Sequence, residues 1–159
     1  MNPRQIVFAV VLLISTCVAG AYAQTSPATV VNKIKLADVR MRDVCILADE
    51  TSKTYYAVSS TFVPASEGRG RPAVHAYTSK DLLTWEGPHI IFQTPNGFWG
   101  DANIRGIWAP ELHAYKGKYY LFATFDTDSK LAEQWRNWLP RVKRGTQVLV
   151  SDSPLGPFK

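Results

Sequence analysis

Cysteine and histidine are scarce in this sequence, which has 2 Cys and 3 His among 159 residues. Cys17 lies just after an N-terminal apolar run, so Cys45 is the single cysteine of the rest of the chain. An intrachain disulfide framework is therefore not expected, and Cys45 is predicted to be a small buried side chain. The sequence also has no His-Glu-x-x-His motif and no paired Cys and His. We therefore expect no metal site, no metal-dependent hydrolysis and no cofactor.

Two other chemical signatures are missing, and so is a strong charge bias. No Gly-x-Ser-x-Gly sequence provides a nucleophile elbow, and no glycine-rich phosphate loop precedes a helix. The formal net charge is +5, from 18 Lys and Arg against 13 Asp and Glu. The basic residues are scattered apart from the cluster at 141–144, so no nucleic-acid partner is expected. The mild positive excess suits a neutral or acidic partner.

The N-terminal apolar run, Ile6–Ile14, is too short to span a bilayer. Arg4 precedes it, and Ala21-Tyr22-Ala23 follows it as a cleavage site of small residues. This combination is typical of a secretory signal peptide over residues 1–23. A lipoprotein anchored at Cys17 is the less fitting alternative. We therefore expect the mature protein to be secreted or periplasmic, with no membrane association after cleavage.

A repeated four-strand pattern organises residues 41–159, after a lead-in segment at 24–40. Residues 106–125 read as a β-hairpin in which Lys116-Gly117-Lys118 links two β-prone runs. Residues 42–60 repeat this pattern, and each copy precedes a second hairpin that ends in a Gly-Pro pair. The expected strands are 44–47, 54–60, 73–78, 85–92, 111–115 and 119–125. Four short strands per repeat are typical of propeller blades, so we predict an all-β fold with two four-stranded blades.

A closed propeller needs at least about four blades, so we expect this chain to be the N-terminal part of a longer protein. The long segments between the expected strands are 61–72, 93–107 and 126–145. The zigzag of the strands places these segments on one face of the propeller, where binding and catalysis are usual. In the last of them, Leu131, Trp135 and Trp138 have helical spacing and Pro140 ends the run. This predicted helix either packs its Trp face on the blade or offers a platform for a sugar ring.

One carboxylate, Asp43, is expected to begin the innermost strand of the first blade, on the face that carries the long loops. Aspartate is depleted in strands, so packing explains it poorly. Asp43 is either a functional group pointing into the central funnel or a cap or ion-pair residue. Glu111 is expected at the equivalent place in the second blade, as a binding or structural acid. His113 alternates with Glu111 on one strand face and is either structural or directed into the channel.

Three aromatic residues are candidate ligand contacts. Trp108 stands just before the inner strand of the second blade, where it either fills the core between blades or contacts a ligand. Phe98 and Trp99 lie in the adjoining Gly-rich loop and are expected to be exposed. Aromatic rings on a funnel wall suit the apolar faces of sugars. A propeller that binds carbohydrate or another partner without catalysis is the alternative to an enzyme.

Five segments together resemble glycoside hydrolase family 43, the secreted five-bladed propellers that cleave arabinose- and xylose-containing plant polysaccharides. They are RDVCILAD, TYYAVSS, TSKDLLTWEGP, GIWAPELHAYKGKYYLFAT and SDSPLGPFK. The resemblance extends over residues 43–159 and implies the first two blades of a five-bladed propeller. It also implies a hydrolase of the α-L-arabinofuranosidase, β-xylosidase or arabinanase type that acts on arabinan- or xylan-type substrates with inversion.

The same resemblance implies roles for particular residues. Asp43 matches the general base, which takes a proton from the water that attacks the anomeric carbon. Trp108 is similar to a Trp that borders the sugar site. Val44 replaces the Pro that usually follows the base. The family's tuning Asp and general-acid Glu come in later blades, beyond Lys159, so residues 24–159 alone are expected to be inactive.

Overall fold

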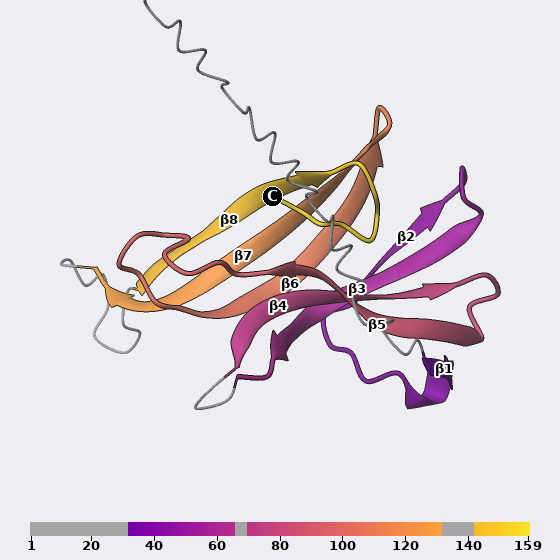
Figure 1. The fold of residues 1–159 in the computed structure, drawn as a ribbon, viewed down its shortest axis with the longest axis horizontal. Coiled ribbons are helices and arrows are strands. Elements are labelled where there is room, and N and C mark those ends of the chain that lie inside the picture. The colour runs from indigo at the N-terminus through magenta and orange to yellow at the C-terminus, as the bar shows by residue number, and fades with distance from the viewer. Residues whose placement is uncertain (1–31, 66–69, 132–141) are drawn as a thin grey trace, which may run out of the picture.

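The computed structural model describes residues 32–65, 70–131 and 142–159, which form two antiparallel β-sheets (Figure 1). The predicted all-β fold is therefore confirmed. The predicted signal peptide, residues 1–23, lies outside the described residues, as do Trp135, Trp138 and Pro140 of the predicted helix. Within the described ranges, no helix has the length and apolar character that crossing a bilayer requires.

The first sheet has five strands in the order β1-β5-β4-β3-β2. Its elements are β1 (Asn32–Lys35), the 3-10 helix η1 (Leu36–Asp38), β2 (Cys45–Asp49), β3 (Thr54–Val63), β4 (Arg71–Ser79) and β5 (Thr84–Gln93). Strands β2 to β5 are the predicted first blade, called blade one below. Strand β1 lies in the segment predicted only as a lead-in, and it extends the outer edge of blade one by pairing with Thr84–Gly87 of β5. The pairing with β5 organises this segment, whose own sequence has no clear strand pattern.

The second sheet, called blade two, has the strand order β6-β7-β8. Its strands are β6 (Ile104–Tyr115), β7 (Lys118–Lys130) and β8 (Val142–Ser151). Lys116 and Gly117 connect β6 to β7 with φ angles of 47° and 73°, and positive φ at both central residues matches the twist of a tight hairpin. Val150 of β8 exchanges backbone hydrogen bonds of 2.9 and 3.2 Å with Lys159, at the place of a fourth strand.

Blade two contains more strand than the sequence predicts. Strand β6 begins inside the segment 93–107, and β7 and β8 extend into 126–145, where Asp126 pairs with Arg144. The described parts of that predicted insertion are therefore mainly strand, and Leu131 has no regular secondary structure. The reason is that the alternation of buried and exposed residues in β7 continues through Thr127, which is only 1% exposed.

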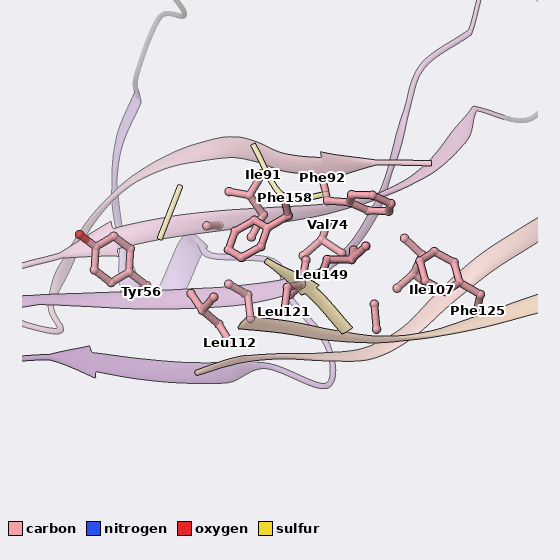
Figure 2. Close-up of a cluster of buried hydrophobic side chains, with 13 residues drawn as sticks. Tyr56, Val74, Ile91, Phe92, Ile107, Leu112, Leu121, Phe125, Leu149 and Phe158 are labelled. Atoms are coloured by element: carbon pink, nitrogen blue, oxygen red, sulfur yellow. The ribbon is translucent and has the colours of Figure 1, made fainter. Parts of the chain in front are cut away.

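The main core lies between the two blades (Figure 2). Its buried side chains come from one face of each sheet: Tyr56, Val58, Val74, Ala76, Ile91 and Phe92 from blade one, and Ile107, Leu112, Leu121, Ala123, Phe125, Leu149 and Phe158 from blade two and its C-terminal continuation. Cys45 packs against this cluster and is half-buried, with its Sγ 4.0 Å from the carbonyl oxygen of Leu112. The packing brings the first strand of blade two, β6, against β2, β3 and β4 of blade one.

A second, smaller cluster covers the opposite face of blade one. It consists of Ala57, Tyr77 and Trp85, with Ile34, Val39, Met41 and Tyr55 packed against them. The chain between β1 and β2 thus crosses this face and then turns into β2. This path places Asp43 directly before the edge strand of blade one.

Candidate functional site

A cavity of about 590 Å³ opens where the two blades meet. Its walls come from Arg42 and Asp43 before β2, from 60–62 in β3, from 105–109 in β6 and from Asp126 in β7. The size falls within the range of ligand-binding pockets, about 300–1,000 Å³. Asp43 and Trp108, which the sequence analysis selected from different blades, therefore line the same cavity.

The backbone before β2 holds Asp43 at this cavity. Asp43 has a positive φ of 50°, an uncommon conformation for a residue with a side chain. The buried hydroxyl of Ser59 donates a 2.6 Å hydrogen bond to the carbonyl of Arg42 and so ties this backbone to β3. The Asp43 carboxylate lies 3.5 Å from Nε of Arg42, and 54% of its side chain is exposed. The carboxylate is thus anchored through its backbone and accessible to a ligand and to water.

Trp108 forms an aromatic wall of the same cavity. Trp108 is 49% exposed, so it lies outside the core between blade one and blade two. The Arg144 guanidinium lies 4.3 Å from the ring centroid, in the geometry of a cation–π contact. A partly exposed ring beside a carboxylate is the arrangement expected of a sugar-binding surface.

Glu111 and His113 do not line this cavity. Leu112 between them is 1% exposed and points into the core between the blades, so its two neighbours point to the opposite face of blade two. There the Glu111 carboxylate lies 3.0 Å from Nε2 of His113. Any role of this pair in sugar binding requires a further part of the protein on that face.

The prediction that Glu111 is the equivalent of Asp43 is wrong. Tyr56 pairs with Leu47, and the matching Tyr120 pairs with His113. Counting back four residues from each partner gives Asp43 in blade one and Ala109 in blade two. These two residues also share a positive φ, of 50° and 39°. Blade two therefore carries no carboxylate at the position of Asp43.

Phe98 and Trp99 are half-buried, which corrects the expectation that they are exposed. Phe98 packs on Phe92 and Phe125, with ring centroids 5.9 and 5.4 Å apart, and Trp99 lies 5.6 Å from Phe125. Phe98 also lines a separate cavity of about 430 Å³, formed with residues 70–72, 94–97 and 100–105. Both rings therefore extend the core beneath the loop 94–103.

Asp126 and Arg144 lie in the segment 126–145, which the sequence predicts as a loop, so neither was a candidate site residue. Arg144 donates from Nε to Oδ1 of Asp126 at 2.8 Å, and its Nη2 lies 2.7 Å from the same oxygen. Their positions, directly opposite in β7 and β8, are the signal that a strand prediction would have used. Among the described residues, no group of three or more His, Cys, Asp or Glu has a metal-binding arrangement.

Residues 36–159 match the family described as Glycosyl hydrolases family 43, and the chain belongs to this family. It is similar to the endo-arabinase of Bacteroides thetaiotaomicron VPI-5482, with 35% sequence identity and a TM-score of 0.56 over 79% of this chain and 36% of that one. A search of curated protein sequences finds no match.

Two further solved structures share the fold. One is a mutant of the GH43 protein BlXynB from Bacillus licheniformis, with 26% identity and a TM-score of 0.52 over 80% of this chain and 24% of that one. The other is the GH43 β-xylosidase/α-arabinofuranosidase CoXyl43 from a compost microbial metagenome, with 20% identity and a TM-score of 0.53 over 79% of this chain and 36% of that one. The chain thus spans little more than a third of the length of these structures, or less.

Proposed function

We propose that this chain is part of a longer protein, called the parent protein below, that is a secreted, inverting glycoside hydrolase. Its proposed substrates are plant polysaccharides containing arabinose or xylose, which it cleaves as an α-L-arabinofuranosidase, β-xylosidase or arabinanase. The observation that carries the proposal is the cavity that Asp43 and Trp108 share. The family match and the 35% identity to an endo-arabinase support it.

In this proposal Asp43 is the general base. Its carboxylate is accessible and accepts a proton from a water molecule as that water attacks the anomeric carbon from the side opposite the leaving group. Trp108 presents its ring to the sugar and holds the anomeric carbon within reach of that water. The positive φ of Asp43 and the Ser59 hydrogen bond before it restrain the base in this position.

The leaving group needs a proton from a second residue. Asp126 lines the cavity, but its Oδ1 accepts both contacts from Arg144, so we do not assign it this role. A general acid from another part of the parent protein completes the proposed site. We therefore propose that residues 24–159 alone do not hydrolyse glycosides. We also propose export from the cytoplasm, because residues 1–23 have the pattern of a signal peptide.

The parent protein and its Asp43→Asn variant test the proposal, with aryl arabinosides, aryl xylosides and the matching oligosaccharides as substrates. The wild type should hydrolyse at least one of them. The variant should lose hydrolysis and keep its affinity for the oligosaccharide, because the amide retains the size of the carboxylate but not its basicity. Sugar binding without hydrolysis by the wild type would favour a non-catalytic carbohydrate-binding propeller.

A further inference from the structure

The contact between Arg144 and Trp108 joins two strands that are not neighbours in blade two. Trp108 lies in β6, at the edge of the sheet, and Arg144 lies in β8 with β7 between them. Asp126, in the intervening strand, pairs directly with Arg144. The guanidinium of Arg144 therefore reaches across β7 to contact the indole ring of Trp108. On the way it is held by the carboxylate of Asp126 in β7.

The geometry restricts all three side chains. Two nitrogens of Arg144 contact one oxygen of Asp126, at 2.8 and 2.7 Å. The Asp126 side chain is only 17% exposed, whereas that of Arg144 is 41% exposed. A planar guanidinium held at two nitrogens has little freedom to leave the ring face, and Lys cannot reproduce both contacts. Arg144 thus occupies one face of the Trp108 ring, so a ligand that stacks on this ring has to use the opposite face.

We propose that Arg144, held by Asp126, is a positioning residue that fixes the ring of Trp108 for a sugar. The proposal rests on the proposed function, because it assigns Trp108 to the sugar-binding site. Arg144 acts through Trp108: it sets the ring angle and directs the sugar to a single ring face. Loss of Arg144 leaves a half-exposed ring that samples several orientations, so fewer molecules at any moment present the competent one.

The backbone pairing of β7 with β8 continues on both sides of this contact. Phe125 pairs with Gly145 on one side of it, and Lys130 pairs with Val142 on the other. Lys143, the residue before Arg144, provides a matched control, because its Nζ lies 5.6 Å from the ring of a different tryptophan, Trp99. A substitution there removes the same charge and the same kind of contact from the same strand.

The experiment compares Arg144→Ala, Lys143→Ala, Trp108→Ala and the double variant Trp108→Ala/Arg144→Ala in the parent protein. The substrate is the aryl glycoside that the wild type cleaves. Arg144→Ala should raise KM about five- to tenfold with a smaller effect on kcat, because the ring contributes mainly to uniform binding. Lys143→Ala should leave both parameters unchanged. The double variant should have the same KM as Trp108→Ala alone, because Arg144 acts only through the ring of Trp108.

Two conservative variants keep the test decisive if Arg144→Ala does not fold. Arg144→Lys keeps the charge and should raise KM as Arg144→Ala does, and Asp126→Asn should raise it less. The proposal would be overturned if the increases in KM from Trp108→Ala and Arg144→Ala multiplied in the double variant. It would also be overturned if Lys143→Ala raised KM as much as Arg144→Ala. An inactive wild type would instead refute the proposed function, so the two failures are distinguishable.

Discussion

The hydroxyl of Tyr119 in β7 donates a 3.2 Å hydrogen bond to the carboxylate of Asp49 at the end of β2, and so ties blade two to blade one across 70 residues of sequence. Asp49 is 8% exposed. It also accepts hydrogen bonds from the backbone of Thr51 and from the backbone and hydroxyl of Ser52. One carboxylate therefore stabilises both a turn and the contact between blades.

Replacing Asp49 should destabilise the fold more than removing its inter-blade partner. Asp49→Ala removes all of these hydrogen bonds and should lower the free energy of unfolding by about 2–3 kcal/mol, whereas Tyr119→Phe removes one and should cost about 1 kcal/mol. Denaturant unfolding of both variants measures the difference. Equal losses for the two variants would show that the turn contacts of Asp49 contribute nothing.

The same carboxylate should make stability depend on pH in the acid range. The Ser52 hydroxyl first, then backbone amides and Tyr119, hold the pKa of Asp49 below its ordinary value, against the effect of burial. Since the folded pKa is the lower one, the stabilisation is complete above the unfolded value of about 4 and is lost as pH falls through the folded value. The difference in unfolding free energy between wild type and Asp49→Asn should therefore shrink below about pH 4. Unfolding measured from pH 7 to pH 2 checks this, and a constant difference would contradict it.

Gly156 should tolerate substitution less well than Gly97. Both have positive φ, of 78° and 67°, so Ala costs about 1–2 kcal/mol of backbone strain at either site. A Cβ at Gly156 would also lie 2.5 Å from the carbonyl oxygen of Ile91, whereas Gly97 has open space around it. Gly156→Ala should thus lower the free energy of unfolding by about 1–3 kcal/mol more than Gly97→Ala does. Matching unfolding midpoints for the two variants would contradict the close approach between the blades.

The exposed face of blade two should be covered in the parent protein if the propeller continues. Val58 and Phe122 are the matching residues two positions after Tyr56 and Tyr120, yet Val58 is fully buried beneath blade two and Phe122 is 38% exposed. Phe122→Ala should lower the free energy of unfolding of residues 24–159 by less than about 1 kcal/mol. In the parent protein it should lower the free energy of unfolding by about 3 kcal/mol. Leu83→Ala, at a side chain that is 69% exposed, is the control. Equal costs of Phe122→Ala in both proteins would refute a third blade on this face.

The sequence was sufficient to predict the repeated hairpins, because strand alternation follows from local patterns. The residues alone left Trp108 as either a core residue or a ligand contact, and only the family resemblance implied that it borders the same site as Asp43. It did not predict the full length of β7, whose polar residues 126–130 resemble a loop. In the fold, Thr127 donates a 2.7 Å hydrogen bond to the carbonyl of Lys143, and Asp126 pairs with Arg144. Cross-strand partners of this kind are invisible until the strands are aligned.

The error about Glu111 has a different origin. Four residues separate β2 from β3, 50–53, but only Lys116 and Gly117 separate β6 from β7. The turn in blade two is therefore two residues shorter than the turn in blade one. Matching Asp43 with Glu111, the first acid of each run, ignores this difference in length. The strand pairing of Tyr56 and Tyr120 reveals it and assigns Ala109 to the place of Asp43.

The most direct test of the account replaces Asp43 by Ala in the parent protein and adds azide to an aryl glycoside substrate. Without its base the variant should lose about 10²–10⁴-fold in hydrolysis rate. Azide is already an anion and needs no deprotonation, so it should attack the anomeric carbon as the aryl leaving group departs. The account predicts a glycosyl azide of inverted configuration and a rate that rises with azide concentration. Unchanged hydrolysis by Asp43→Ala, or a lost rate that azide does not restore, would contradict the assignment of Asp43 as the base.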